Sequence, residues 1–384
     1  MFRRRQSIRM FARWSLVLAA VAAAGGRASL SRAGDQPAGP AATAHASVQA
    51  SRILVRGRPF FPVMLIDQCF PADFAGERRL GINMVINESC PGIPAVQQLR
   101  LIQRDALAVL PIAGSRVRGA AVAGWAYPDE PEGNGWSLPR LRAAFAFRRG
   151  TSDGLLSFIT TGAGFLSSPY THRTVSRREY ARYARLADVA GFDLYPLDHC
   201  SSDLSAVYDA QRSFQTLAGA MPTFQWIETG PIRPQYCGGF TMTPAELRAE
   251  VWLAVAGGAR GIGYFTHTWS PEHRSFDVSP SLQHEMARID SLLTAIRPAL
   301  LGRTVPSGVD SSSVKVVARA TASGTTVIAV NAARLPITVK LRVPALVNGP
   351  VRVFGERRQL TASQGRVSDY FPPLAVHIYT QPSR

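Results

Sequence analysis

Eight short apolar runs alternate with segments of helical character between residues 60 and 266. Most of the runs are bracketed by Gly, Pro or Asn and are almost continuously apolar, which is typical of strands buried on both faces of a parallel sheet. Repeated alternation of strand and helix over this length predicts a (β/α)8 TIM barrel. The predicted strands are Phe60–Leu65, Asn83–Asn87, Ala108–Ile112, Ala121–Tyr127, Leu156–Thr161, Val189–Tyr195, Thr223–Glu228 and Gly261–Thr266.

Six helices are predicted between these strands, and two of them begin with clear signals. Thr243 is followed by a first-turn proline and by Glu246, and Ser176 forms a capping box with Glu179. The connections after the first and third strands are too short for full helices, so we expect irregular segments there. The predicted helices are Pro94–Arg104, Leu138–Arg149, Ser176–Ala187, Leu204–Ala220, Pro244–Gly257 and Ser281–Ile296.

The pattern changes after Arg297-Pro298, where apolar residues begin to alternate at period two between turn residues. This change predicts a small all-β sandwich. We therefore assign residues 51–300 to the barrel and 301–384 to the C-terminal β-domain. The strands predicted there are Val314–Ala320, Thr326–Asn331, Thr338–Val343, Val351–Phe354 and Ala375–Tyr379.

The first residues have the pattern of a secretory signal peptide. Five arginines precede a short apolar run from Trp14 to Ala24, and small residues follow. Cleavage after Ala24, Ala33 or Ala46 fits the small-residue rule, and Gly25–Ala50 is predicted to be a flexible leader, so residues 1–50 are assigned to signal and leader. We expect a secreted, periplasmic or cell-envelope protein with no stable membrane span after cleavage; an uncleaved anchor is the alternative.

The chain is strongly basic, with 43 Lys and Arg against 26 Asp and Glu. No basic run interleaved with aromatic residues occurs in the body of the chain, which argues against nucleic-acid binding. Residues 303–384 contain 11 basic residues and three acidic ones, a local balance of +8. An anionic polysaccharide is a candidate partner for this region, and a solvated basic face is the alternative.

Four cysteines in a protein predicted to be exported indicate two disulfides. Three pairings exist. Cys69–Cys90 and Cys200–Cys237 are favoured, because each would join the ends of neighbouring predicted strands. No Cys-x-x-Cys spacing supports a zinc site, the seven His and four Cys form no metal-ligand spacing, and we expect neither metal nor cofactor.

Two predicted strands end on a glutamate. The segment Val122–Gly133 reads VAGWAYPDEPEG and places Glu130 directly after the fourth strand, while Glu228 ends the seventh. Because the carboxyl ends of barrel strands meet at one mouth, the two acids are expected to share a site. Paired carboxyls, one protonated and one ionised, suit cleavage of a glycosidic bond.

With a glutamate after the fourth strand and another ending the seventh, the chain resembles a glycoside hydrolase of clan A. The resemblance covers residues 52–384 and rests on strand count and position. It implies a retaining glycosidase in which Glu130 is the acid/base and Glu228 the nucleophile, acting on a polysaccharide or oligosaccharide without a cofactor. Members of the clan usually have Asn before the acid/base, whereas this chain has Asp129.

Asp129 leaves two alternatives open. An Asp-Glu pair after the fourth strand also resembles substrate-assisted N-acetylhexosaminidases, in which the Asp orients an N-acetyl group that acts as nucleophile; Glu228 argues against this assignment. The other alternative is a catalytically silent carbohydrate- or envelope-binding protein. Neither the sugar nor the oligomeric state is encoded in a motif.

Several further residues are predicted to contact substrate. Trp125 and Tyr127 beside Glu130, and Trp226 before Glu228, would supply apolar walls that raise the pKa of one acid. The resemblance implies that Tyr195, at the end of the sixth strand, hydrogen-bonds the nucleophile, and that Trp269 with His267 stacks on a sugar ring. Asp67 and Asn87, at the ends of the first two strands, are candidates for binding sugar hydroxyls.

Overall fold

The computed structural model describes residues 44–66, 68, 74–86, 97, 99–100, 102, 106–111, 119–146, 154–166, 175–232, 234, 237 and 239–383. Within this part of the chain, no helix is both long enough and apolar enough to cross a membrane. The predicted signal peptide, its cleavage sites and most of the leader lie outside the described residues.

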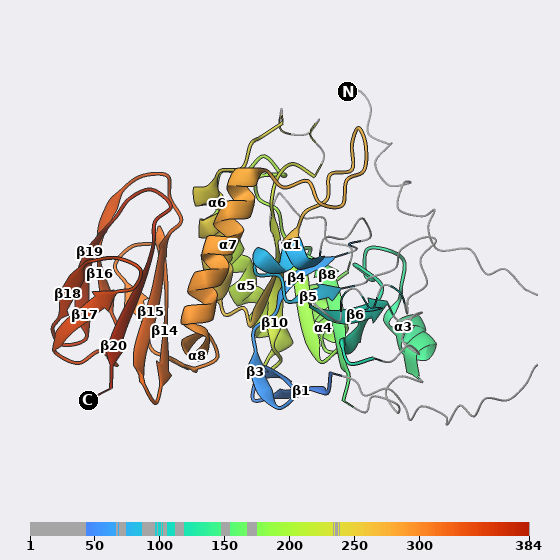
Figure 1. Ribbon diagram of the computed structural model, residues 1–384, viewed down its shortest axis with the longest axis horizontal. Helices are drawn as coiled ribbons and strands as arrows, with labels where there is room; N and C mark the ends of the chain where they lie inside the picture. Colours follow the sequence, from blue (N-terminus) through green and yellow to red (C-terminus); the bar gives the residue numbers. More distant parts are fainter. Residues whose placement is uncertain are drawn as a thin grey trace, which may run out of the picture. The chain divides into compact units, whose positions relative to one another are not determined.

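Eight parallel strands close into a barrel (Figure 1), which confirms the predicted fold class. Each observed strand overlaps one predicted strand, and neighbours in the barrel follow one another along the chain. The strands are β4 (Val63–Ile66), β5 (Met84–Ile86), β6 (Leu107–Pro111), β7 (Val122–Ala126), β8 (Leu156–Gly162), β9 (Val189–Asp193), β10 (Thr223–Glu228) and β11 (Gly261–Phe265).

Helices cover the outside of the barrel and begin where their caps predict. The hydroxyl of Thr243 accepts from the Glu246 backbone N–H, and the Glu246 carboxylate accepts from the Thr243 N–H at 2.7 Å; Ser176 and Glu179 form the same arrangement. The helices are α1 (Phe74–Arg79), α3 (Leu138–Phe145), α4 (Arg177–Ala184), α5 (Ser205–Ala218), α6 (Pro244–Gly257), α7 (Pro280–Ala295) and α8 (Arg297–Leu300).

Of the two connections predicted to be irregular, the one after the first barrel strand contains a helix and the one after the third lies outside the described residues. The segment after the first barrel strand contains the six-residue helix α1, where we predicted irregular structure. A short helix is sufficient for this connection, because the chain only has to reach the neighbouring strand β5. The segment after the third strand, residues 112–118, and most of the predicted helix Pro94–Arg104 lie outside the described residues.

A three-stranded antiparallel sheet closes the N-terminal end of the barrel, and the sequence analysis missed it. It contains β1 (Ala46–Gln49), β2 (Arg52–Val55) and β3 (Arg58–Phe60). The Ala46 N–H donates to the Gly154 carbonyl at 2.8 Å, just before β8, and Ile53 packs into the barrel interior. The prediction of a flexible leader up to Ala50 is therefore wrong for the residues of β1.

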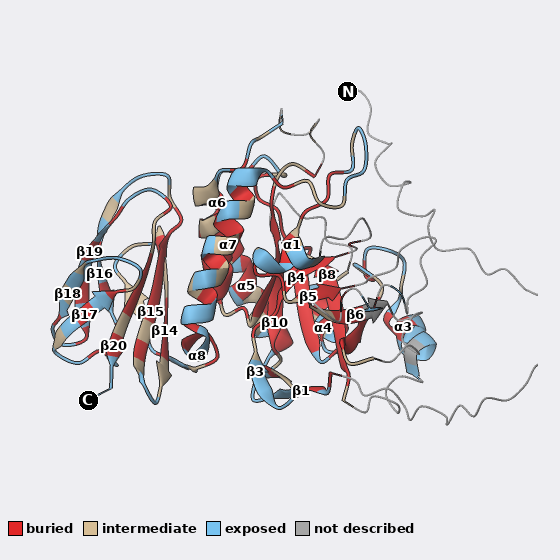
Figure 2. Cartoon of the chain, viewed as in Figure 1, coloured by how far each residue is buried: buried red, intermediate tan, exposed pale blue. Residues whose placement is uncertain are grey.

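Two large aromatic rings fill the barrel interior because glycines on neighbouring strands make room for them. A Cβ on Gly191 would lie 2.2 Å from the Phe224 ring, and one on Gly263 would lie 2.1 Å from the Trp226 ring. These are overlaps with rigid rings, so glycine is required at both positions. Figure 2 shows that the barrel strands are buried, whereas α3 and α7 each have an exposed face.

The C-terminal β-domain contains a six-stranded and a three-stranded sheet, in agreement with the predicted all-β region. Four of these strands were not predicted. In one of them, β19, buried and exposed residues alternate, but charged and polar side chains occur among them, so no apolar run marks the strand in the sequence. The strands are β12 (Arg303–Val305), β13 (Gly308–Val309), β14 (Val314–Thr321), β15 (Gly324–Asn331), β16 (Ile337–Arg342), β17 (Gly349–Val353), β18 (Gln359–Ala362), β19 (Arg366–Phe371) and β20 (Val376–Pro382).

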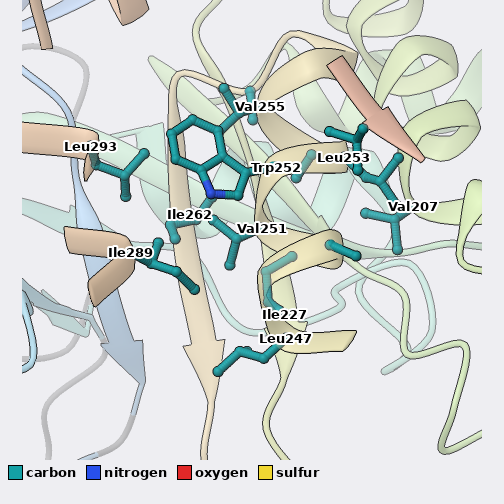
Figure 3. Packing of buried hydrophobic residues seen from close by; sticks show 14 of the residues in the cluster. Val207, Ile227, Leu247, Val251, Trp252, Leu253, Val255, Ile262, Ile289 and Leu293 are labelled. Carbon is teal, nitrogen blue, oxygen red and sulfur yellow. The ribbon is translucent and has the colours of Figure 1, made fainter. Parts of the chain in front are cut away.

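Helix α6 is buried on all sides because it packs on the barrel and on the β-domain at once. Its Trp252 has no exposed surface and belongs to a cluster that includes Ile227 and Ile262 of the barrel and Ile328 of β15 (Figure 3). The run VWLAVAG in its second half is apolar on all faces, as expected for a helix in such a position.

One predicted disulfide is present: Cys200, after β9, is bonded to Cys237, after β10. The bond joins the connections that follow two neighbouring strands at the carboxyl end of the barrel. Cys69 and Cys90, predicted to form the other disulfide, lie outside the described residues.

Candidate active site

Glu130 lies at the mouth of the barrel, just after β7. Its backbone has a φ of 38°, in the left-handed region that a residue with a side chain rarely adopts. The turn is held by the Glu130 N–H, which donates to the Thr160 carbonyl at 3.2 Å, and by the Glu130 carbonyl, which accepts from Gly133 and Asn134 at 2.9 Å each. The chain thus fixes Glu130 at the end of the strand, where the sequence predicted it.

The side chain of Glu130 extends over the end of the neighbouring strand β8. A Cβ placed on Gly162 would lie 2.9 Å from Oε1 of Glu130, so any larger residue there would displace the carboxyl group. Gly162 is paired in register with Asp193, the last residue of β9. The absence of a side chain on Gly162 therefore lets Glu130 approach Asp193.

Asp193 and Glu130 form a carboxyl–carboxyl pair. Burial, the charges of Glu130 and Asp129, and the hydrogen bond to Glu130 raise the pKa of Asp193 well above its usual range. The raised pKa favours the protonated form of Asp193 beside Glu130. In the sequence, Asp193 shares a strand face with Tyr195, which leaves two positions open for it, the barrel mouth or an internal pair.

Glu132 adds a third carboxyl beside this pair. It is 8% exposed, and its Oε1 accepts from the Gly162 N–H at 2.6 Å. Burial raises the pKa of Glu132 to about 8, so the group is protonated at neutral pH. Glu132 was also missed in the sequence, although it follows Glu130 by two residues.

Glu228 occupies the predicted strand end but has no exposed surface. Its two carboxylate oxygens accept from the backbone N–H groups of Leu197 and Asp198, at 2.8 and 2.9 Å. Burial raises the pKa of Glu228 to about 8. The connection after β9 therefore covers this carboxyl group, and the Cys200–Cys237 disulfide joins that connection to the one after β10.

A second acid, Glu250 of α6, lies next to Glu228 in the protein interior. Glu250 is fully buried, and burial together with the charge of Glu228 raises the pKa of Glu250 well above its usual range. Because Glu228 already accepts two backbone N–H groups, the proton of this pair belongs on Glu250, which donates to Glu228. The site thus contains two acid pairs, one open to the mouth and one enclosed.

Tyr195 connects these two pairs. It is buried, and burial followed by the charges of Asp193, Asp129, Glu130 and Glu228 raises the pKa of its hydroxyl well above the usual range. Since the charges of both acid pairs raise the pKa of the Tyr195 hydroxyl, Tyr195 must lie near both pairs. This agrees with the predicted position of Tyr195 at the site, and the predicted hydrogen bond to Glu228 stays a prediction.

Aromatic rings lead from Tyr195 to the surface. Phe265 lies 5.3 Å from Tyr195 and 5.3 Å from His267, between ring centres. Trp269 stacks on His273 at 4.4 Å with an angle of 9° between the rings, and is 42% exposed. We call these five residues the aromatic strip. An exposed indole face is suited to the apolar face of a sugar ring.

Three predicted substrate contacts are wrong. Trp125 and Tyr127 pack against each other at 4.9 Å in the layer between β7 and the helices, because alternation along the strand directs them away from the mouth. Trp226 is buried inside the barrel and donates from Nε1 to the Thr160 hydroxyl at 3.1 Å. Asp129 is exposed beside Glu130, whereas Asp67 and Asn87 lie outside the described residues.

No protein-family model matches the chain, and no curated protein matches its sequence. Solved structures do resemble it. An α-amylase from Geobacillus thermoleovorans matches with a TM-score of 0.58 and 11% identity over 84% of this chain and 98% of its own. A GH30 endoxylanase from Clostridium papyrosolvens matches with a TM-score of 0.48 and 11% identity, over 89% of this chain and 99% of its own. The likeness to the amylase shows that the chain shares a barrel fold with a C-terminal β-domain.

Proposed function

We propose that this protein is a glycoside hydrolase whose acid/base is Glu130. The observation that carries the proposal is the Glu130–Asp193 carboxyl pair at the carboxyl end of the barrel, with the aromatic strip leading away from it. Glycosidic cleavage needs a proton for the leaving oxygen and a negative charge near the developing oxocarbenium ion. The pair brings two carboxyl groups, one of them with a raised pKa, to one point of the mouth, where both roles can be filled.

The reaction proceeds with retention of configuration if Glu228 is the nucleophile, as the clan A resemblance implies. Hydrogen bonds from two backbone N–H groups stabilise the ionised form of Glu228, but burial outweighs them and raises its pKa to about 8, so the carboxyl must be opened to the mouth before it can act as an ionised nucleophile. Since Glu228 has no exposed surface, substrate binding must displace the covering segment at Leu197 and Asp198 before the carboxylate reaches an anomeric carbon.

A second mechanism is favoured by that same enclosure. Asp129 is exposed directly beside Glu130, and in a substrate-assisted N-acetylhexosaminidase an Asp-Glu pair suffices without a nucleophile on the seventh strand. Glu228 would then be a structural acid that holds the connection after β9. The two mechanisms make opposite predictions for Glu228 and for the N-acetyl group of the substrate.

The substrate class is a polysaccharide or oligosaccharide, and the enzyme acts outside the cytoplasm, as its predicted signal peptide implies. The α-amylase that shares the fold is itself a glycosidase. An exposed Trp269 at the outer end of the aromatic strip suits a substrate that extends beyond the acids. A protein that binds carbohydrate without cleaving it is the remaining alternative.

The test is hydrolysis of a panel of polysaccharides and aryl glycosides, with and without N-acetyl groups, by the full chain. Glu130→Gln should abolish turnover while the circular dichroism spectrum and melting temperature are retained. Glu356→Gln, an exposed glutamate of the β-domain, serves as the matched control and should keep full activity. Turnover that survives Glu130→Gln would refute the assignment of the acid/base.

Two further variants separate the mechanisms. Loss of activity in Glu228→Gln, with retained anomeric configuration in the wild type by NMR, would support the double displacement. Loss in Asp129→Asn, with Glu228→Gln active and only N-acetylated sugars cleaved, would support substrate assistance. Binding of a panel member without any cleavage would favour the binding protein.

A further inference from the structure

A pocket at the N-terminal end of the barrel, opposite the mouth, is lined by three arginines. Arg52 of β2, Arg297 of α8 and Arg303 of β12 border it, together with the turn between β14 and β15. The pocket lies at this end because β2 belongs to the sheet that pairs with the starts of β7 and β8. Its volume is about 660 Å³, within the range of sites for small organic ligands.

Two more arginines lie behind this lining. Arg260, directly before β11, donates to the Leu300 carbonyl at 2.6 Å, and Arg319 of β14 donates to the Thr304 hydroxyl and is 3% exposed. The charge of Arg52 acts on Arg260, and that of Arg260 acts on Arg319. Burial and these neighbouring charges lower the pKa of both guanidinium groups, that of Arg319 to about 9.

Acidic partners are missing from this cluster among the residues that the structure describes. No ion pair there involves Arg52, Arg260, Arg303 or Arg319. The charge of Asp290 interacts with that of Arg297. The lining arginines Arg52, Arg297 and Arg303 are exposed, whereas Arg319 behind them is buried, and an anion in the pocket would offset the mutual repulsion of these like charges.

We infer that this pocket binds the oxyanion group of a small organic ligand. The planar fork of a guanidinium group matches the paired oxygens of carboxylate, sulfate or phosphate, so arginines converging on one cavity recognise any of these groups. The pocket is larger than a bare oxyanion needs, which leaves room for the molecule that bears the group. This site is separate from the barrel mouth and does not depend on the proposed activity.

Isothermal titration calorimetry on the full chain at low ionic strength tests the inference. The probes are glucuronate, glucose 6-sulfate and glucose 6-phosphate, with glucose as the uncharged control and inorganic sulfate as the bare ion. At least one charged sugar should bind saturably at one site, whereas glucose should not bind. The three charged probes separate carboxylate, sulfate and phosphate as the preferred group.

The double variant Arg52→Gln/Arg303→Gln removes two lining cations and should weaken binding about tenfold or more, since a charge-assisted hydrogen bond contributes about 1.5–3 kcal/mol. The matched control is Arg342→Gln/Arg366→Gln, which removes the same charge from an exposed cross-strand pair of the β-domain. The control should bind as tightly as wild type. Absence of saturable binding to every charged probe, or equal weakening in both double variants, would overturn the inference.

Discussion

Glu132 gives the sharpest test of the electrostatics of the site. Its pKa is raised from 4.5 to about 8 because the carboxyl is buried, so the folded state binds the proton more tightly than the unfolded state. For an acid with a raised pKa, the linkage sign is unfavourable: stability is lost as the pH rises from 4.5 towards 8. At 1.36 kcal/mol per unit, the free energy of unfolding is about 3 kcal/mol lower at pH 7 than below pH 4.5, because Glu132 ionises in the unfolded state while it stays protonated in the folded state.

Glu132→Gln removes this titration while keeping an oxygen that can accept from the Gly162 N–H. Between pH 5 and pH 8, wild type should lose about 3.5 kcal/mol of stability that the variant does not lose. Comparing the two proteins cancels the contributions of the other acids. The measurement is urea unfolding of both proteins at half-unit pH intervals, with Glu272→Gln as the control at an exposed glutamate. Stability curves that stay parallel for wild type and Glu132→Gln over this range would refute the reasoning.

Three further predictions follow from the packing and the surface. Gly263→Ala should lower the free energy of unfolding by about 1–3 kcal/mol by forcing a methyl group onto the Trp226 ring, whereas Gly230→Ala, with no atom within 4 Å of the added methyl, should be nearly neutral in the same denaturation assay. Cys200→Ser removes a disulfide between residues 37 apart in sequence and should cost about 2–4 kcal/mol, measured against wild type in oxidising buffer; an unchanged melting temperature would contradict this. Trp269→Ala should raise KM for a long substrate several-fold with little change in melting temperature, because the ring is 42% exposed; an unchanged KM would remove this residue from the substrate path.

The barrel could be predicted from the sequence because its strands are buried on both faces. Such strands read as apolar runs with little dependence on their neighbours, and all eight overlap the observed ones. The sheet β1 to β3 could not be found in the same way. Its strands have mostly exposed or partly exposed residues, such as Ser47 and Arg58, and only Ala46 and Ile53 are deeply buried.

The strand ends of the site were predictable, but the directions of the side chains were not. Glu130 and Glu228 both lie where the sequence placed them, yet one is open to the mouth and the other is enclosed. The difference comes from the connection after β9, whose backbone N–H groups reach Glu228. Irregular segments of this kind carry no periodic pattern, so their contacts are invisible in the sequence.

Glu250 decides how the enclosed pair contributes to catalysis. If Glu228 is the nucleophile, a donor on Glu250 stabilises its ionised form against the effect of burial, and a hydrogen bond to a charged group contributes about 1.5–3 kcal/mol. Glu250→Leu should then lower kcat by about tenfold to a hundredfold, whereas Glu250→Gln, which can still donate an N–H to Glu228, should restore most of that loss. If Glu228 only holds the connection after β9, both variants should change the melting temperature and leave kcat within about twofold of wild type. Measuring kcat and melting temperature for the two variants therefore separates a positioning role of Glu250 from a purely structural one, because only the positioning role makes kcat follow the hydrogen-bond donor.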